Sequence, residues 1–432
     1  MSTAKALTEL YEERKDITNK YVHATSRGHE AIQLAAAFQL KPQDFVFPYY
    51  RDDAMLLGMG FTPFDLMLQL MAKGTDYFSG GRTYYSHPSS NREDLPKIPH
   101  QSSATGMQVI PATGTAQGLQ YKEQQALAAF KKGEEPLVIC SLGDGAVTEG
   151  EVSEALQMAV LHNYPIIYLV QDNDWGISAT AAEVRSMNAY EYAAGFKGLE
   201  RIHTDGSDFT ASFAAMETAI GYVRHERRPI LVQADVPLLG HHTSGVRMEW
   251  YRTPEDLQKH AARDPVPRLR ALLEKRGANP EELDQIEKTV AADIQAAFDK
   301  AMQAAAPLPE TVEEHVFAPA AVTVESGTRA PAGNPPVLMV AAALPRATSQ
   351  ATTTTTTAPH PRRDPFFPHV ALSIVVSFLP IYPDRLSCRL VCKAWEQEIT
   401  ESGLATEFRI GGDYFPHLPN YMHLPPSFVE MI

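Results

Sequence analysis

An aspartate and an asparagine, 29 residues apart, have the chemistry to share one hard cation. Asp144 lies in the run Gly143-Asp144-Gly145, and Asn173 follows a second apolar stretch of the chain. Magnesium takes about six oxygen ligands at roughly 2.0–2.1 Å and often shares them with a phosphate. Asp144 offers a charged oxygen, Asn173 a neutral one, and a loop carbonyl near Trp175 a third. An isolated Gly-Asp-Gly more often marks a simple turn, so the cation site depends on the elements that position it.

The elements around these residues predict a parallel sheet. Residues 136–142 and 165–170 are short, apolar and rich in β-forming residues, as buried strands are. Residues 148–162 have the apolar spacing of a helix. Strand, helix and strand with short joints form a βαβ unit, whose strands are parallel and joined right-handedly. Asp144 and Asn173 then stand at the carboxyl ends of the strands, where open α/β sheets bind ligands.

A third segment leads to the same edge. Residues 208–228 read as a helix and residues 229–236 as a strand that runs into His241 and His242. Adjacent histidines are usually solvated or hold one hydrogen bond, and a zinc site lacks partner ligands at suitable spacing. A histidine at the end of a third strand can nevertheless reach a diphosphate held by the first two.

Upstream residues add a phosphate-binding candidate. Tyr50 offers a hydroxyl, and Arg51 offers a guanidinium whose planar fork suits phosphate oxygens. The alternative is a surface ion pair of Arg51 with Asp52 or Asp53, which has little energetic value.

The order of these motifs resembles the α subunit of the thiamine-diphosphate-dependent 2-oxo acid dehydrogenases. These are the decarboxylating components of the pyruvate and branched-chain (2-oxoisovalerate, or 3-methyl-2-oxobutanoate) dehydrogenase complexes. Several motifs in one order make a far more specific match than any one of them. The matching stretches are Arg27–Ala31, Tyr49–Asp52, Gly80–Arg82, Ser102–Gly106, Gly143–Gly145, Asp172–Ser178 and His241–Thr243.

The resemblance implies a thiamine-diphosphate-binding fold, that is, an α/β fold with an open, mainly parallel sheet and helices on both faces. It implies thiamine diphosphate and Mg²⁺ as cofactors, with residues 102–108 on the aminopyrimidine side. An imidazole whose unperturbed pKa lies near 7 can act there as acid or base. The implied magnesium ligands are Asp144, Asn173 and the Trp175 carbonyl; the further cofactor contacts are Tyr50, Arg51, Ser103, Gly143, Gly145 and His242; and the catalytic candidates are His241 and His242.

The resemblance also implies a reaction and partners. A 2-oxo acid is oxidatively decarboxylated, as in branched-chain amino acid catabolism, with thiamine diphosphate as electron sink. The acyl group then passes to the lipoyl arm of an acyltransferase partner. In this family the β subunit of an α₂β₂ heterotetramer supplies the carboxylate that activates the aminopyrimidine, so the α chain alone should bind the cofactor weakly or not at all. Pyruvate and branched-chain 2-oxo acids both stay open as substrates.

Two positions depart from the family pattern. Gln171 stands where the family often has an arginine that helps to bind phosphate, so phosphate affinity should depend more on Arg51 and the metal. Thr243 stands where mitochondrial relatives carry a regulated serine. A phosphate on Thr243 would add roughly −2 charge beside a diphosphate.

Composition favours a cytoplasmic enzyme. The 432 residues include 38 Lys and Arg against 52 Asp and Glu, and this net charge of −14 argues against nucleic-acid binding. Three cysteines form no disulfide framework, and Cys140 lies in a predicted core strand. The N-terminus lacks the pattern of a signal or transit peptide. No apolar run reaches the roughly 18 residues that span a membrane.

The chain changes character near residue 306. We predict a dehydrogenase α domain over 1–305, closed by a helix that starts at Asn279-Pro280, and a disordered Ala/Pro/Thr-rich linker over 306–365. We predict a small α-helical tail over 366–432, in which residues 366–400 resemble an F-box that docks onto a Skp-type adaptor. Two hypotheses therefore compete: an enzyme subunit, or an F-box adaptor of a ubiquitin ligase that carries an inactive enzyme-like domain. A composite gene model would also explain the pairing.

Overall fold

The computed structural model describes residues 1–314 except 20–21, 84, 100–101 and 128–129. The F-box-like segment over 366–400 and all but the first nine residues of the 306–365 segment lie outside the described residues. The description below therefore concerns the predicted dehydrogenase α domain.

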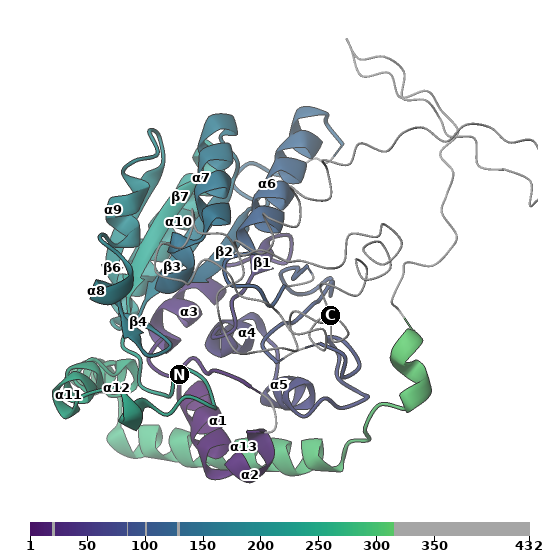
Figure 1. Cartoon of the computed structure of the whole chain (residues 1–432), viewed down its shortest axis with the longest axis vertical. Helices are drawn as coiled ribbons and strands as arrows, with labels where there is room; N and C mark the ends of the chain where they lie inside the picture. The colour runs from purple at the N-terminus through teal and green to yellow at the C-terminus, as the bar shows by residue number, and fades with distance from the viewer. Residues whose placement is uncertain (20–21, 84, 100–101, 128–129, 315–432) are drawn as a thin grey trace, which may run out of the picture. The chain divides into compact units, whose positions relative to one another are not determined.

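Five parallel strands form the central sheet, in the order β1-β2-β3-β7-β6 (Figure 1). The register pairs Gly143 with Gln171 and Asp172 with Asp235, so the carboxyl ends of β2, β3 and β7 lie at one edge. The three predicted strands and the predicted βαβ unit are confirmed. The strands are β1 (Phe45–Phe47), β2 (Val138–Gly143), β3 (Ile166–Asp172), β7 (Ile230–Asp235) and β6 (Glu200–Asp205).

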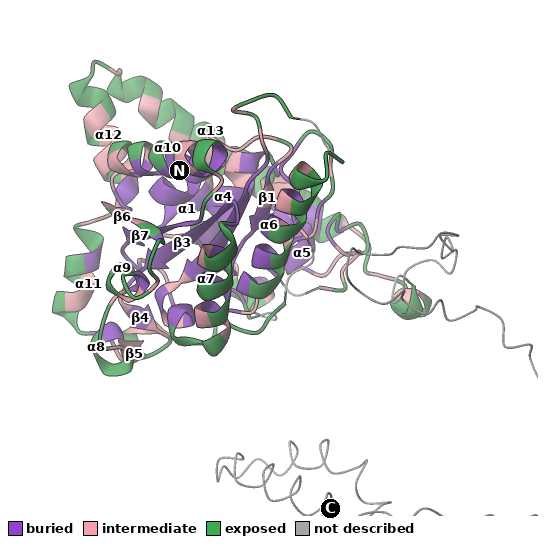
Figure 2. Cartoon of the chain, turned by 90° about the horizontal axis from the view of Figure 1, so that it is seen from above, coloured by how far each residue is buried: buried purple, intermediate pink, exposed green. Residues whose placement is uncertain are grey.

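Alternating side chains of the strands enter two different cores. Val138 and Cys140 pack into one apolar cluster, whereas Ile139 between them packs into the other. Successive side chains of a strand point to opposite faces, and both faces of a parallel sheet are normally covered. Figure 2 shows the buried strands between helices whose outer sides are exposed. The continuous apolar runs in the sequence follow from this two-sided burial.

Helices cover both faces, as predicted. The cluster with Val138 contains side chains of α6, α7 and α9, and the cluster with Ile139 contains those of α1, α3, α4, α5, α10 and α13. The bounds are α1 (Ser2–Glu13), α3 (Glu30–Ala37), α4 (Asp53–Met59), α5 (Pro63–Leu70), α6 (Val109–Gln124), α7 (Gly150–His162), α9 (Ala189–Ala193), α10 (Phe209–Glu226) and α13 (Pro280–Gln303).

Shorter elements connect these layers. Among the described residues they are the helices α2 (Lys15–Thr18), α8 (Ala181–Val184), α11 (Pro254–Ala261) and α12 (Pro265–Lys275), the hairpin strands β4 (Trp175–Gly176) and β5 (Ala179–Thr180), and the 3₁₀ turns η1 (Asp144–Thr148), η2 (Met248–Trp250) and η3 (Pro309–Glu313). The last of these turns falls in the segment that we expected to be a linker.

The ends of the long helices follow their capping residues. The Asn279 side chain accepts the backbone N–H of Glu281 at 2.9 Å, and Pro280 occupies the first turn, as the sequence predicted. Asp208 caps α10 in the same way by accepting the Ala211 N–H at 2.9 Å.

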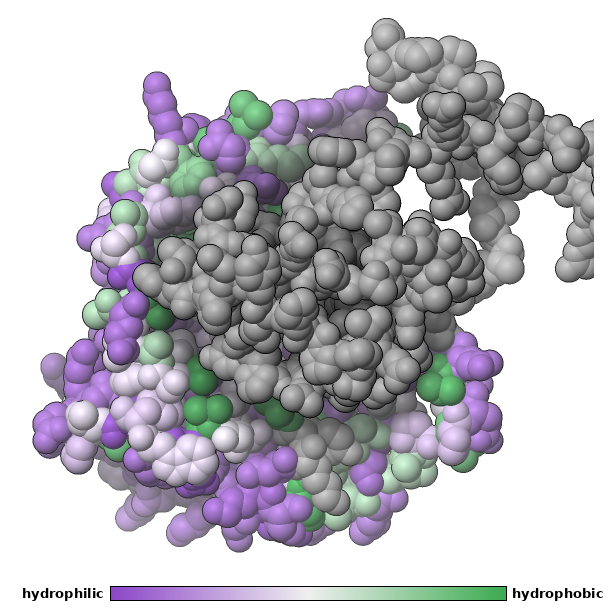
Figure 3. Space-filling model, in the orientation of Figure 1, coloured by the Kyte–Doolittle hydropathy of each residue, from purple (hydrophilic) through white to green (hydrophobic). Residues whose placement is uncertain are grey.

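One face of the described part of the chain can be seen in Figure 3. On the face drawn in Figure 3, hydrophilic residues predominate and hydrophobic ones are scattered, which is ordinary for a protein surface. No helix in the described part of the chain has the length and hydrophobicity needed to cross a bilayer.

Candidate active site

A cavity of about 380 Å³ opens at the carboxyl edge of the sheet. Its position agrees with the ligand-binding edge of open α/β sheets. Its walls come from the ends of β1, β2 and β3, the segment before α6, and the loop after β7. The lining residues are Pro48–Tyr50, Ser86 and His87, Ser102–Gly106, Gln108, Gly143–Ala146, Asn173, Trp175–Ile177, His242 and Thr243.

The three residues of the predicted cation site meet in this cavity. Asp144 follows β2, and Asn173 and Trp175 follow β3. Only 2% of Asp144 and 3% of Asn173 are exposed, and the Trp175 N–H donates to Asn173 Oδ1 at 3.1 Å. In the described part of the chain, no three His, Cys, Asp or Glu side chains converge as a metal cluster. One carboxylate, one amide and one carbonyl would leave the remaining positions around Mg²⁺ to phosphate and water.

The Asp144 carboxylate lies in a crowded electrostatic environment. Burial and the neighbouring Asp172 carboxylate raise the pKa of Asp144 to about 7, while the Arg185 guanidinium and the Asn173 backbone amide oppose that rise. Arg185 Nη1 lies 3.3 Å from Asp144 Oδ2. A divalent cation would supply positive charge beside Asp144 and so stabilise the ionised form of this buried carboxyl group.

His242 lies in the cavity wall, as predicted. It is 6% exposed, and its Nδ1 has no hydrogen-bond partner among the described residues. The predicted role as acid or base assumed an unperturbed pKa, but burial and the nearby Arg51 lower the pKa of His242 to about 3 in this environment. A neutral imidazole with a free Nδ1 can hydrogen-bond a ligand in the cavity.

Tyr50 lines the cavity, but Arg51 lies behind it. Arg51 is 1% exposed and donates to the carbonyls of Thr25 (3.3 Å) and His242 (3.0 Å), while its Nε has no hydrogen-bond partner among the described residues. A surface ion pair with Asp52 or Asp53 is therefore excluded, because all three side chains are buried. Arg51 fixes the backbone at His242, and its charge lies close to the cavity wall.

The other predicted site residues divide into two groups. Ser103 and the two glycines Gly143 and Gly145 line the cavity. His241 does not: its Nδ1 accepts the Met248 N–H at 3.1 Å, and its Nε2 lies 3.4 Å from a Glu12 carboxylate oxygen. Adjacent histidines in an extended loop point in different directions, so only one of the pair faces the cavity.

A buried polar network beneath the cavity was missed by the sequence analysis. Gln171 Oε1 lies 2.9 Å from His29 Nδ1 and accepts from Gln33 Nε2, and Gln171 Nε2 donates to Asp52 (2.7 Å) and Ser141 (2.8 Å). Gln171 is fully buried and does not line the cavity, so it cannot donate to a phosphate there. The sequence signal was the four-residue spacing of His29 and Gln33, which places both on one face of a helix.

The loop that carries Asn173 has strained backbone. Asp174 and Ile177 have positive φ values of 69° and 56°. Ile177 lies in the tight turn between β4 and β5, where glycine, asparagine or aspartate is usual. A β-branched residue in this conformation is uncommon, and such strain is found most often at binding sites.

Comparison with known proteins identifies similar sequences over the same region. The family described as "Dehydrogenase E1 component" matches residues 3–310. The chain is 29% identical over 278 residues (64% of this chain) to the mitochondrial 2-oxoisovalerate dehydrogenase subunit alpha 2 of Arabidopsis thaliana, and spans only 56% of that relative's length. It is 29% identical over 295 residues (68% of this chain, 85% of the relative) to the 2-oxoisovalerate dehydrogenase subunit alpha of Bacillus subtilis. It is 28% identical over 278 residues (64% of this chain, 71% of the relative) to the pyruvate dehydrogenase E1 component subunit alpha of Mycoplasma genitalium.

Proposed function

The chain belongs to the dehydrogenase E1 component family, and on that premise we propose that it is the α subunit of a 2-oxo acid dehydrogenase that binds Mg²⁺ and thiamine diphosphate. The observation that supports this most directly is the convergence of Asp144, Asn173 and Trp175 in one cavity with Tyr50 and His242. Bound thiamine diphosphate supplies the nucleophilic carbon and the electron sink for decarboxylation.

The chain's own residues bind and orient. Asp144, Asn173 and the Trp175 carbonyl would hold Mg²⁺ at the carboxyl ends of β2 and β3. The Tyr50 hydroxyl and the unpartnered Nδ1 of His242 would take hydrogen-bonding positions toward a diphosphate. Arg51 would act through its charge and its hold on the His242 backbone, because its guanidinium donates to carbonyls behind the wall. Ser103 would lie toward the aminopyrimidine.

Substrate class, partners and location are proposals of the same kind. The relatives named for 2-oxoisovalerate and for pyruvate are almost equally similar to this chain. Their similarity supports a 2-oxo acid as substrate but does not distinguish a branched-chain 2-oxo acid from pyruvate. We expect a β subunit to complete the site and a lipoyl-bearing acyltransferase to accept the acyl group. The name of the plant relative includes "mitochondrial", whereas composition favours the cytoplasm for this chain.

Isothermal titration calorimetry with thiamine diphosphate and Mg²⁺ tests the proposal. We expect saturable binding by the full chain with a candidate β subunit, and much weaker binding by the chain alone. Asp144→Asn should lower the affinity for Mg²⁺ and thiamine diphosphate. Loss of an outer-sphere partner of a metal ligand costs about 10- to 100-fold in metal affinity, so loss of the charge of a direct ligand should cost at least as much.

Asp174→Asn is the matched control. It removes a carboxylate from the same loop, half-exposed and paired with Lys259 rather than with the cation site, and asparagine tolerates the positive φ at this position. Equal effects of Asp144→Asn and Asp174→Asn, or no binding with any β subunit, would reject the proposed site.

A further inference from the structure

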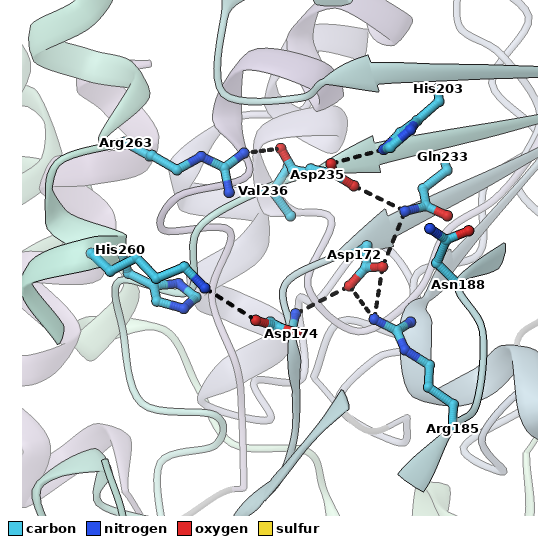
Figure 4. Close-up of a pocket in the computed structure, with 11 residues that line it drawn as sticks. Asp172, Asp174, Arg185, Asn188, His203, Gln233, Asp235, Val236, His260 and Arg263 are labelled. Atoms are coloured by element: carbon cyan, nitrogen blue, oxygen red, sulfur yellow. Dashed lines mark hydrogen bonds and ion pairs between the residues drawn. The ribbon is translucent and has the colours of Figure 1, made fainter. Parts of the chain in front are cut away.

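A second cavity, of about 370 Å³, lies beside the first at the ends of β3, β7 and β6 (Figure 4). Most of its charged side chains are already paired. Lys259 lies 3.5 Å from an Asp174 oxygen, and His203 Nε2 lies 2.8 Å from Asp235 Oδ2. Arg185 differs from these groups because it reaches out of this cavity to a residue of the first one.

The Arg185 guanidinium lies between two buried carboxylates. Its Nη2 donates to both oxygens of Asp172, at 2.7 and 2.8 Å. Its Nη1 has no hydrogen-bond partner among the described residues but forms an ion pair with Asp144, 3.3 Å from Oδ2. Figure 4 shows Asp172 held from the other side by Gln233, which donates at 3.2 Å. The side chains of Arg185, Asp172 and Asp144 are 10%, 9% and 4% exposed. The guanidinium therefore offsets the repulsion between two carboxylates that is little screened by water.

The backbone between Asn173 and Arg185 forms a loop that returns to its starting point at the end of β3. It leaves β3 at Asn173, forms the β4–β5 hairpin and the short helix α8, and returns with Arg185 to the end of the same strand. The Ala181 N–H donates to the Asp174 carbonyl at 2.9 Å, and the Arg185 N–H donates to the Ala181 carbonyl at 3.0 Å. Arg185 thus anchors the far end of the loop whose near end carries Asn173 and Trp175.

We infer that Arg185 is a positioning residue for the cation site: its charge, 3.3 Å from Asp144 Oδ2, orients that carboxylate, and its hydrogen bonds to Asp172 anchor the loop that bears Asn173 and Trp175. This inference rests on the proposed function, because it takes Asp144 as a metal ligand. The inference adds Arg185, which does not line the first cavity, to the residues that would govern metal affinity.

Two effects of Arg185 on a cation have opposite signs, and this makes the inference testable. A guanidinium close to Mg²⁺ repels it, so loss of Arg185 by repulsion alone would tighten metal binding. Loss of positioning would weaken it, because an outer-sphere partner that orients a ligand typically contributes about 10- to 100-fold to metal affinity. We expect positioning to dominate, since the Asp172 carboxylate already neutralises Arg185 at 2.7 Å.

Electron paramagnetic resonance of Mn²⁺ measures the affinity without reference to catalysis. The full chain, with saturating thiamine diphosphate and with the β subunit if the wild type requires it, is titrated with Mn²⁺. Arg185→Gln should weaken Mn²⁺ binding by about 10- to 100-fold. Arg185→Lys should fall between this variant and the wild type, because lysine keeps the charge but lacks the planar fork of the guanidinium.

Arg263→Gln is the matched control. Arg263 lines the same second cavity, where it donates to Asp205 (3.3 Å) and to the Asp235 carbonyl (2.8 Å) and does not contact Asp144. Its loss should leave Mn²⁺ affinity unchanged. Unchanged or tighter binding by Arg185→Gln, or equal weakening by both variants, would overturn the inference.

Two further measurements separate other outcomes. Asp144→Asn tests the site itself. If this variant binds Mn²⁺ like the wild type, the proposed function fails. If Asp144→Asn weakens Mn²⁺ binding but Arg185→Gln does not, only the role of Arg185 is rejected. If Arg185→Gln does not fold, hydrogen exchange of the wild type decides. Mn²⁺ with thiamine diphosphate should slow amide exchange in residues 177–185, and no slowing there would contradict the inference.

Discussion

Asp53 lies fully buried at the start of α4, beside the loop that carries Tyr50 and Arg51. Its Oδ1 accepts the Tyr85 hydroxyl at 3.0 Å, yet burial raises the pKa of Asp53 to about 7. The free energy of unfolding therefore contains a contribution from this carboxyl that is fully present below about pH 4, the unfolded pKa. It is lost as the pH rises through about 7, because only the unfolded chain ionises easily in that range.

We predict that Asp53→Asn removes this pH dependence. Wild type should lose stability between about pH 4 and pH 7 relative to the variant, by an amount on the order of 4 kcal/mol for a shift of this size. Urea unfolding at pH 4, 5.5 and 7 measures the difference between the two proteins. A difference that stays constant over this range would contradict the raised pKa.

At single residues, the sequence pointed to the cavity-lining residues better than to the side chains that support them. Asp144, Asn173, Trp175, Tyr50 and His242 could be chosen because their types suit a cation and a diphosphate and because apolar strands end beside them. Gln171 and Arg185 could not, since their roles depend on partners up to 142 positions away in the chain. The depressed pKa of His242 likewise depends on burial and on Arg51, which no local pattern shows.

Among the elements, β3 is the middle strand of the sheet, and Gln171 connects it to three neighbours. Its amide contacts β2 through Ser141, α3 through His29 and Gln33, and the loop before α4 through Asp52. Each buried polar group that loses its partner costs about 1–3 kcal/mol. Gln171→Leu should therefore lower the free energy of unfolding by about 3 kcal/mol or more.

Chemical denaturation of Gln171→Leu and of Gln295→Leu measures this effect. Gln295 lies on the exposed side of α13, where its amide bonds only Asp299 four residues on, so its substitution should change stability by less than about 0.5 kcal/mol. Similar losses in both variants would show that the network beneath the cavity has no special role.

The sequence predicted the strands that have continuous apolar runs and missed those that do not. The strands over 136–142, 165–170 and 229–236 were clear because burial on both faces requires continuous apolar residues. β6 reads Glu-Arg-Ile-His-Thr-Asp and lies at the edge of the sheet, half-exposed, so it has no apolar run. β1 has three residues, too few for a period to appear.

For the molecule as a whole, α13 sets the boundary of the described fold. Ile294, Phe298 and Ala301 are at most 2% exposed and belong to the core that contains α1. Burial of each large side chain contributes about 1.5–3 kcal/mol, and a domain has only about 5–15 kcal/mol of net stability. The Gly74 N–H also donates to the Ala305 carbonyl at 2.9 Å.

We predict that a fragment of residues 1–314 folds with the melting temperature of the full chain, whereas a fragment of residues 1–279 does not fold. Near-ultraviolet circular dichroism and thermal unfolding compare the two fragments with the full chain. A folded 1–279 fragment would show that α13 is dispensable. An unfolded 1–314 fragment would place the end of the domain further along the chain.

The order of the strands in space also has a consequence for synthesis of the chain. β7 bonds to both β3 and β6, although both of them precede it in the sequence. On a translating ribosome, β3 and β6 emerge first, and the edges of both strands that will pair with β7 stay unpaired until β7 inserts between them. Unpaired edges recruit strands of other chains, so the nascent protein is most exposed to aggregation, and most dependent on chaperones, during the interval before residues 230–235 leave the exit tunnel.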